Sequence, residues 1–323
     1  MLKTAIIGCG NIAGFLDVPD QEGILTHAHA YAKHEQTDLV AVCDPLLESR
    51  RSFVQTWGEN IHHYDSFKTL LASHTIDMVS ICSPTNFHFE AMVLALKDKH
   101  IQTIICEKPF IHTQDELDKL KILMPIHPKK ILINFMRRFD PSIQKIHHFI
   151  TNKTFGQIIS FNGKFTKGLY HNGSHMLELI EHLCGDITAL SSHNLRKDGD
   201  DFYGNFILDC SDIEGVLQNF SGDNYALFEL EIVLSKGRIL IKDSGHTIQI
   251  QTVEPSQKYK GYFNLKQTDT LDDTMNQNLY NTIDFALKEN TDVFNKHLSL
   301  SQKLLDIKNH LEDKKRLKWN THA

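Results

Sequence analysis

The sequence predicts an α/β chain of two domains: a parallel sheet with helices on both faces, then an α+β domain with a large, mostly antiparallel sheet. The chain has 323 residues, more than one small core needs. Over roughly the first 120 residues, short apolar runs alternate with helical periodicity, which is typical of a parallel sheet. Beyond Phe135, short strand-like runs follow one another at hairpin spacing, which indicates an antiparallel sheet.

The predicted N-terminal elements alternate in the order that a doubly wound sheet requires. Apolar runs that end at polar or turn-forming residues predict strands at residues 5–7, 38–43, 78–82, 103–106 and 131–135. Apolar residues at helical spacing predict helices near residues 27–34, 89–97 and 115–123. Each helix would return the chain to the same edge of the sheet before the next strand begins.

The second half reads as strands with few helices. Strands are expected at residues 158–161, 206–208, 215–217, 227–232 and 238–241, and a helix at residues 174–183. Helical periodicity returns over residues 274–287 and 300–311. Pro125 and Pro128 break the pattern between the halves, so we predict a doubly wound α/β domain over residues 1–123 and an α+β domain over residues 124–323.

Composition and charge exclude several classes of protein. The formal net charge of -6 argues against a general nucleic-acid binder, because phosphate binding favours a basic surface. We see neither a signal peptide nor an apolar run as long as a membrane span, and expect a cytoplasmic protein without membrane contact. No CxxC pair occurs, so no metal site is predicted. Buried free thiols of a reducing compartment are expected at Cys9, Cys43, Cys82, Cys106, Cys184 and Cys210.

A glycine-rich turn directly follows the first predicted strand. It reads Gly8-Cys9-Gly10-Asn11-Ile12-Ala13, a G-x-G-x-x-A pattern in which one glycine permits the tight turn and the other lets a pyrophosphate approach the backbone. Ala13 stands where a third glycine often occurs. A plain structural turn is the alternative, but the position between a strand and a helix favours dinucleotide binding. Residues 15–26 look like an inserted loop at the phosphate end of this site.

Asp44 ends the second predicted strand. A carboxylate there can accept hydrogen bonds from the adenosine ribose hydroxyls and would repel a 2′-phosphate, so we predict NAD in preference to NADP. The alternative is a turn-forming aspartate before Pro45. Arg50 and Arg51 follow closely and could weaken the preference for NAD.

Five segments in this order resemble the motifs of the Gfo/Idh/MocA family of oxidoreductases, whose members resemble glucose–fructose oxidoreductase and inositol dehydrogenase. The resemblance covers most of the chain. It implies a Rossmann domain that binds NAD(P), with Lys108 as the catalytic lysine and His175 as the catalytic histidine. The segments are Gly8-Cys9-Gly10-Asn11-Ile12-Ala13, Ser83-Pro84-Thr85-Asn86-Phe87-His88, Glu107-Lys108-Pro109, Met136-Arg137-Arg138-Phe139-Asp140-Pro141 and Gly173-Ser174-His175-Met176-Leu177-Glu178.

The motifs imply two sets of site residues and no metal ligands. The expected cofactor-binding residues are Gly8, Gly10, Asn11, Ile12, Asp44, Ser83, Pro84, Asn86, His88, Glu107 and Lys108. The expected substrate-binding residues are Lys108, Arg138, His171, Asn172 and His175. For Arg138 a surface ion pair is an equally good interpretation, and for His175 the alternative is a helix-cap histidine.

Two positions depart from the family pattern. The family commonly has Asp four residues before the catalytic histidine, where this chain has His171, and Glu178 replaces the family's usual Asp. A neutral imidazole at position 171 supplies less negative charge than a carboxylate, so we expect a lower pKa for Lys108 here and better tolerance of an anionic substrate group.

The chemistry of these residues suits hydride transfer at a hydroxyl-bearing carbon. A histidine exchanges a proton near neutrality, and an ammonium stabilises a developing alkoxide. The resemblance therefore implies an NAD(P)-dependent oxidoreductase for a sugar, cyclitol or nucleotide-linked sugar, with a weaker indication of surface-polysaccharide metabolism. The alternatives are an imine or carbonyl reductase of the same fold and a cofactor-binding sensor without turnover. Family members pair through the second domain's sheet, so we expect a homodimer or homotetramer.

Overall fold

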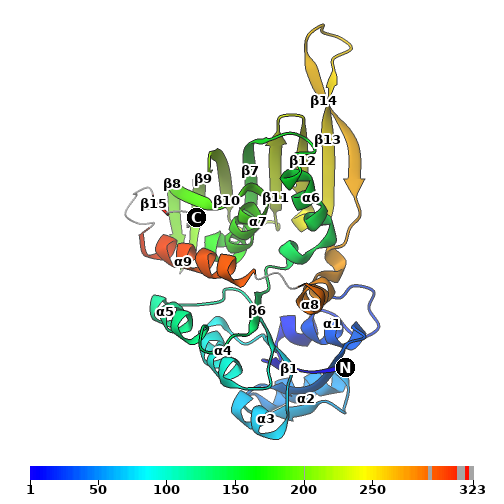
Figure 1. The fold of residues 1–323 in the computed structure, drawn as a ribbon, viewed down its shortest axis with the longest axis vertical. Coiled ribbons are helices and arrows are strands. Elements are labelled where there is room, and N and C mark those ends of the chain that lie inside the picture. The colour runs from blue at the N-terminus through cyan, green and yellow to red at the C-terminus, as the bar shows by residue number, and fades with distance from the viewer. Residues whose placement is uncertain (200, 290–292, 311–316, 320–323) are drawn as a thin grey trace. The chain divides into compact units, whose positions relative to one another are not determined.

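The computed structural model describes residues 1–199, 201–289, 293–310 and 317–319, drawn in Figure 1. The chain forms two compact units. The first comprises Met1–Phe139 with Asn276–Leu305, and the second comprises Asp140–Met275 with Asp306–Ala323.

The first unit contains a six-stranded sheet in which every pairing between described strands is parallel. β1 pairs with β2 on one side and with β4 on the other, so the order of strands reverses at β1. This arrangement confirms the predicted doubly wound sheet, and it places a topological switch point at the carboxyl end of β1. In spatial order the strands are β3 (His62–Tyr64), β2 (Thr37–Cys43), β1 (Leu2–Ile7), β4 (Met78–Ile81), β5 (Thr103–Cys106) and β6 (Lys130–Ile133).

Helices follow the strands of this unit, and the returning segment Asn276–Leu305 adds α8 and most of α9 (Phe294–His310). Helix α8 packs against α1. The helices are α1 (His27–Lys33), α2 (Leu47–Trp57), α3 (Phe67–Ser73), α4 (His88–Lys97), α5 (Gln114–Leu123) and α8 (Asn278–Lys288). Helices predicted near residues 27–34, 89–97 and 115–123 are confirmed, whereas α2, β3 and α3 had no assignment.

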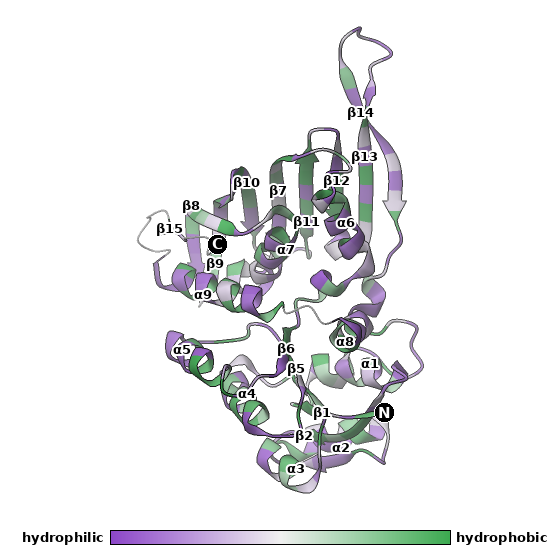
Figure 2. Ribbon diagram, in the orientation of Figure 1, coloured by the Kyte–Doolittle hydropathy of each residue, from purple (hydrophilic) through white to green (hydrophobic). Residues whose placement is uncertain are grey.

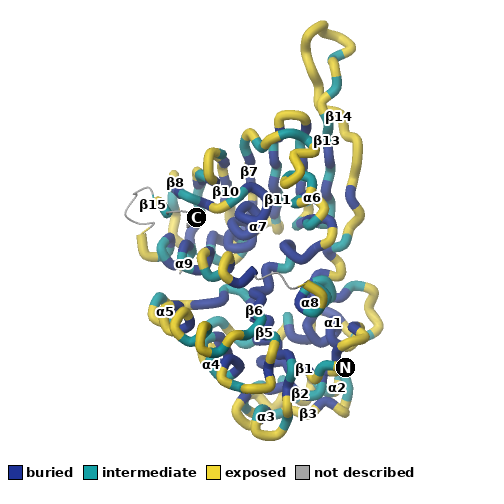
Figure 3. Tube along the Cα trace, in the orientation of Figure 1, coloured by how far each residue is buried: buried dark blue, intermediate teal, exposed yellow. Residues whose placement is uncertain are grey.

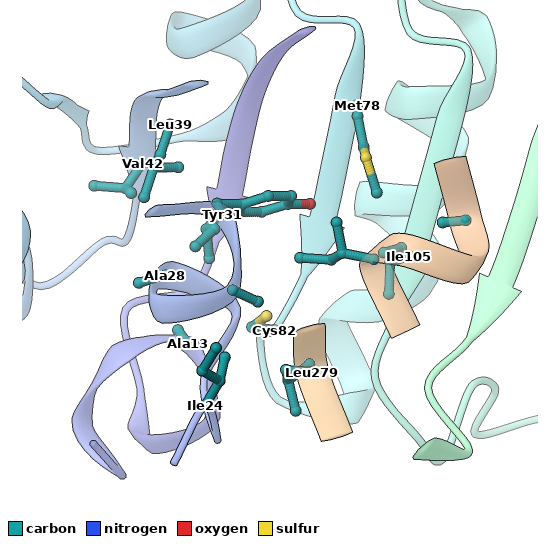
Figure 4. Close-up of a cluster of buried hydrophobic side chains, with 14 of the residues drawn as sticks. Ala13, Ile24, Ala28, Tyr31, Leu39, Val42, Met78, Cys82, Ile105 and Leu279 are labelled. Carbon is teal, nitrogen blue, oxygen red and sulfur yellow. The ribbon is translucent and has the colours of Figure 1, made fainter. Parts of the chain in front are cut away.

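One apolar cluster joins the sheet to α1 and α8 (Figure 4). Tyr31 of α1, Met78 of β4, Ile105 of β5 and Leu279 of α8 are each at most 1% exposed. Because α8 completes this core, residues 276–305 belong to the first unit although they lie late in the sequence. The division between the units at Phe139 also differs from the predicted boundary after residue 123, since β6 is the last strand of the parallel sheet.

The second unit is built on a nine-stranded sheet. Among its paired strands only β7 and β10 run parallel within the described residues, which confirms the predicted mostly antiparallel sheet. In spatial order the strands are β14 (Phe263–Leu271), β13 (Thr247–Pro255), β12 (Gly237–Lys242), β11 (Phe228–Leu234), β7 (Ile158–Thr166), β10 (Ile213–Phe220), β9 (Asp201–Cys210), β8 (Ile187–Asp198) and β15 (Leu317–Lys318).

Helices α6 (Pro141–Thr151) and α7 (Ser174–Cys184) lie on one face of this sheet (Figure 1). Hydropathy alternates along β13, as Figure 2 shows, and buried and exposed residues alternate along β10. Gly163 of β7 leaves room for its neighbours, because a Cβ there would lie 2.5 Å from Leu217 Cδ2 of β10 and 3.2 Å from the sulfur of Met176 of α7. The opposite face keeps exposed apolar side chains at Ile207 and Val216, which stand directly opposite each other in β9 and β10.

A short helical turn and a loop separate the glycine turn from α1. Residues Asn11–Phe15 form a single π-helical turn, and α1 begins only at His27. The intervening segment matches the predicted insert, and Figure 3 shows both buried and exposed positions along it. The buried carboxylate of Asp17 anchors it by accepting hydrogen bonds from the backbone N–H groups of Leu25 and Thr26. The helix expected at residues 300–311 corresponds to α9 (Phe294–His310), and position 311 lies outside the described residues. No helix among the described residues is long and apolar enough to cross a membrane.

Candidate active site

Glycine suits the two positions of the turn after β1 for different structural reasons. Gly8 has a φ of +93°, and a Cβ there would lie 2.8 Å from the Cα of Ser83. Gly10 has no atom within 4 Å of the position its Cβ would take. Gly8 is therefore required by the close approach of the segment after β4, whereas Gly10 leaves open backbone that a pyrophosphate could approach.

The residue that packs closely against α2 is Gly14. It lies one position after Ala13, where a third glycine often occurs. A Cβ on Gly14 would lie 2.6 Å from both Phe53 Cε2 and Trp57 Nε1 of α2. The Trp57 indole also donates a hydrogen bond of 2.8 Å to the carbonyl of Gly14. The aromatic residues Phe53 and Trp57 could have indicated this contact, but no helix was predicted over residues 47–57.

Asp44 serves as a turn former and also lines a pocket. Its carboxylate accepts hydrogen bonds from the backbone N–H groups of Cys9 at 2.9 Å and Leu46 at 2.8 Å. Arg50 Nη1 donates to the carbonyl of Asp44 at 2.5 Å. The two interpretations offered for Asp44 are therefore compatible, and its carboxylate ties the end of β2 to the glycine turn.

A pocket of about 420 Å³ opens at the carboxyl ends of β1, β2 and β4 in the first unit. Its lining is mostly apolar and also contains the carboxylates of Asp44 and Asp65, a combination that suits an adenosine moiety. Sequence reasoning missed Asp65, since β3 was not recognised. Lys68 and Glu90, also in the lining, form an exposed ion pair at 3.8 Å. The lining residues are Ile7, Gly8, Cys43, Asp44, Pro45, Leu46, Asp65, Ser66, Phe67, Lys68, Ser83, Pro84, Phe87, Glu90, Ala91 and Leu94.

The remaining cofactor residues predicted in this unit have different surroundings. Asn11 and Asn86 are exposed beside the glycine turn and in the short turn Thr85–Phe87. His88 is 1% exposed, with Nε2 2.7 Å from the Ser83 carbonyl and Nδ1 3.0 Å from the Pro109 carbonyl. Burial lowers its pKa although both carbonyls act to raise it. The ring therefore contacts the loops after β4 and after β5, although a neutral imidazole can donate to only one of the two carbonyls.

Glu107 and Lys108 follow directly after β5. Glu107 is 9% exposed, and its Oε1 accepts hydrogen bonds from His27 Nε2 at 3.0 Å and Asn134 Nδ2 at 2.6 Å. Burial acts to raise the Glu107 pKa, but the hydrogen bonds and the charges of His27 and Lys108 outweigh it and hold the pKa below its usual value. Lys108 is half-buried and precedes Pro109 through a cis peptide bond.

The histidine motif lies in the second unit. His175 is 7% exposed in the first turn of α7, preceded by a π-helical turn, Gly168–Gly173. His171 is exposed in that turn, and Asn172 is half-buried. The carboxylate of Asp201 accepts hydrogen bonds from the backbone N–H groups of Tyr170 at 2.8 Å and His171 at 3.2 Å, and so positions the turn. Sequence reasoning missed Asp201, because this residue belongs to none of the recognised motifs.

Arg138 and the cysteines complete the set of predicted features. Arg138 is 4% exposed in the short helix Met136–Phe139, which disfavours the exposed ion pair considered for it. The six cysteines are all free and buried, as predicted. The described residues include no group of His, Cys, Asp and Glu side chains suited to a metal ion.

Comparison with known proteins agrees with this geometry. Residues 2–135 match the family model GFO_IDH_MocA, described as an oxidoreductase family with an NAD-binding Rossmann fold. Residues 2–135, in the first unit, are therefore similar to the NAD-binding domain of the Gfo/Idh/MocA family. The match lies on the unit whose strand ends carry the glycine turn, Asp44 and Lys108, so the NAD-binding domain and the family resemblance are both confirmed.

Individual relatives share about a quarter of their aligned residues or fewer with this chain. The chain is 26% identical over 220 residues to D-glucoside 3-dehydrogenase of Escherichia coli K12, a match that covers 61% of this chain and only 59% of that relative. It is 23% identical over 285 residues to myo-inositol 2-dehydrogenase of Thermotoga maritima, covering 81% of each. A levoglucosan dehydrogenase solved with NADH and levoglucosan shares the fold, with a TM-score of 0.78, 14% identity and 99% coverage of each chain.

We predict that Asp44 makes this chain bind NADH more tightly than NADPH. Asp44→Asn removes the charge that repels a 2′-phosphate and keeps one oxygen, which can accept from only one of the Cys9 and Leu46 amides, because these bond different oxygens of Asp44. The preference for NADH should fall by about tenfold or more, the scale of one unpaired charge contact. Fluorescence titration with both dinucleotides measures it.

The control is Asp38→Asn, at the other end of the same strand, where the side chain is exposed. It should leave both affinities unchanged. A wild-type chain that binds NADPH more tightly would contradict the prediction and direct attention to Arg50 and Arg51.

Proposed function

We propose that this chain is an NAD(P)-dependent dehydrogenase or reductase acting on a hydroxyl or keto carbon of a sugar, cyclitol or nucleotide-linked sugar. The observation that carries the proposal is the position of Lys108. It follows β5 at the same edge of the sheet where β1, β2 and β4 form the pocket. Open α/β sheets bind ligands outside the carboxyl ends of their strands.

The two candidate catalytic residues have complementary chemistry. NAD, when bound, accepts a hydride from the alcohol carbon. His175 takes the hydroxyl proton as general base, and the Lys108 ammonium stabilises the developing negative charge on the same oxygen. In the reverse direction His175 returns the proton to the carbonyl oxygen. Arg138, His171 and Asn172 are assigned to holding the remaining substrate hydroxyls.

The substrate class rests on the relatives and on one departure in this chain. The compared proteins are named for a glucoside, an inositol and levoglucosan, all of which carry several hydroxyl groups. His171 replaces an aspartate of the family pattern, and an anionic group on the substrate would then meet less repulsion. We assign an acidic sugar, free or nucleotide-linked, as the favoured ligand, with surface-polysaccharide metabolism as the setting.

We predict that Lys108→Ala and His175→Ala each lower kcat by about 100- to 10,000-fold, as expected when a general acid–base or charge-stabilising group is lost. NADH affinity should change little. The assay is NAD reduction at 340 nm with a panel of polyols, neutral sugars and sugar acids, and Lys97→Ala, an exposed lysine at the end of α4, is the control.

Two outcomes would contradict the assignment. A wild-type chain that binds NADH but reduces no NAD on any member of the panel would favour the cofactor-binding sensor. Turnover of imines alone would favour the imine reductase.

His171→Asp tests the substrate charge. The new carboxylate should weaken binding of an acidic sugar by about 1 kcal/mol or more, through repulsion between like charges at short range. The affinity for the matched neutral sugar should hold or improve, because a carboxylate accepts hydrogen bonds from hydroxyls. Titration of wild type and variant with matched neutral and acidic sugars decides the question, and an unchanged ratio would remove His171 from the substrate site.

We also propose a homodimer or homotetramer that pairs through the sheet face opposite α6 and α7. Ile207, Val216 and Phe220 are 41%, 37% and 46% exposed on that face, and paired oligomers commonly bury such residues. Val216→Arg should shift the molar mass measured by light scattering toward the monomer. Ile122→Arg, on α5 and 68% exposed, is the control. A wild-type monomer would contradict the proposal.

A further inference from the structure

A chain of buried hydrogen bonds runs beneath the segment that carries Lys108. Thr282 Oγ1 of α8 donates to Asn134 Oδ1 at 3.1 Å, and Asn134 Nδ2 donates to Glu107 Oε1 at 2.6 Å. His27 Nε2 of α1 donates to the same Glu107 oxygen at 3.0 Å. These residues come from four segments of the first unit, namely α1, the segments after β5 and β6, and α8.

Stability alone does not account for this arrangement. The side chains of His27 and Glu107 are 0% and 12% exposed, so both polar groups give up water. Desolvation of a buried pair roughly offsets its attraction, and well-packed apolar residues would stabilise the unit as well or better. His27 Nδ1 is buried without a hydrogen-bond partner, which adds a further cost.

The position of the Glu107 carboxylate suggests a function that offsets the desolvation of this buried pair. We infer that His27 and Asn134 are positioning residues that hold Glu107 in place as a fixed negative charge beside Lys108, and so keep Lys108 in its ammonium form. Lys108 adjoins Glu107 in the chain, and two donors on one oxygen limit rotation of the carboxylate. The consequence for catalysis rests on the proposed function.

The charges around Glu107 agree with this role. The charge of Lys108 lowers the pKa of Glu107, and the same interaction must favour the proton on Lys108. Burial raises the pKa values of Cys82 and Cys106 well above their usual value, and burial lowers that of His88. Those three groups are therefore neutral near pH 7. The titratable groups that face Glu107 are His27 of α1, Cys82 after β4, His88 of α4, Cys106 of β5 and Lys108.

The same helix supplies a matched control. His29 of α1 contacts Asp17 at 2.9 Å, and both side chains are 0% exposed. That pair resembles His27 and Glu107 in chemistry, distance and burial, but Asp17 anchors the loop before α1 rather than the segment of Lys108. Loss of either histidine should therefore cost similar stability, whereas only His27 should influence Lys108.

The experiment measures the pKa of Lys108 directly, from the pH dependence of its acylation rate in the intact chain, quantified by peptide mass spectrometry. Glu107→Gln preserves the shape but removes the charge, and should lower the pKa of Lys108 by about one unit, or tenfold in proton affinity. His27→Phe should also lower the pKa of Lys108. His27→Gln, whose amide can still donate, should restore most of the wild-type value, and His29→Phe should leave it unchanged.

The outcomes separate this inference from the proposed function, because acylation needs no substrate. An unchanged Lys108 pKa in Glu107→Gln, or equal shifts in His27→Phe and His29→Phe, would overturn the inference even if the chain oxidises sugars. Shifts in the expected order would support it even if no substrate is turned over. Where turnover is found, the basic limb of the kcat/KM profile should move with the acylation pKa.

Discussion

Parallel pairing of β1 with both β2 and β4 is the constraint on which the rest of the first unit depends. It brings the carboxyl ends of these strands to one edge, where the order of strands reverses. The glycine turn, Asp44 and Ser83 follow those strands directly, so segments far apart in the sequence form a single pocket. Because Gly8, Asp44 and Ser83 lie just beyond the ends of β1, β2 and β4, a shift in strand register would move them apart.

Buried polar side chains hold the loops at this edge in place. His88 contacts carbonyls of the loops after β4 and β5, and Asp44 joins the end of β2 to the turn after β1. Glu107 joins α1 to the segments after β5 and β6. Such groups cost free energy when they lose water, and they hold a defined geometry only when their partners are all present. The loops that would contact a dinucleotide are thus held in position by buried polar side chains.

Sequence reasoning succeeded where chemistry is local. Gly8 stands in a short motif at a strand end, and the pattern of apolar runs identified β1, β2, β4, β5 and both sheet types. The role of Lys108, in another such motif, stays a prediction. Sequence reasoning failed where tertiary packing decides. The role of Gly14 depends on two aromatic side chains of α2, that of Asp201 on a turn some 30 residues earlier, and the place of α8 on a core formed mainly by the first part of the chain.

Hydrogen exchange with and without NADH tests the central claim, that the carboxyl edge of the parallel sheet is the dinucleotide site. The account predicts that NADH slows exchange of the backbone amides in residues 8–12, at the glycine turn, and in residues 83–86, after β4, because both segments would contact the cofactor. The amides of β13 and β14 should exchange as before. Protection confined to the second unit, or no protection of residues 8–12 at saturating NADH, would contradict the account.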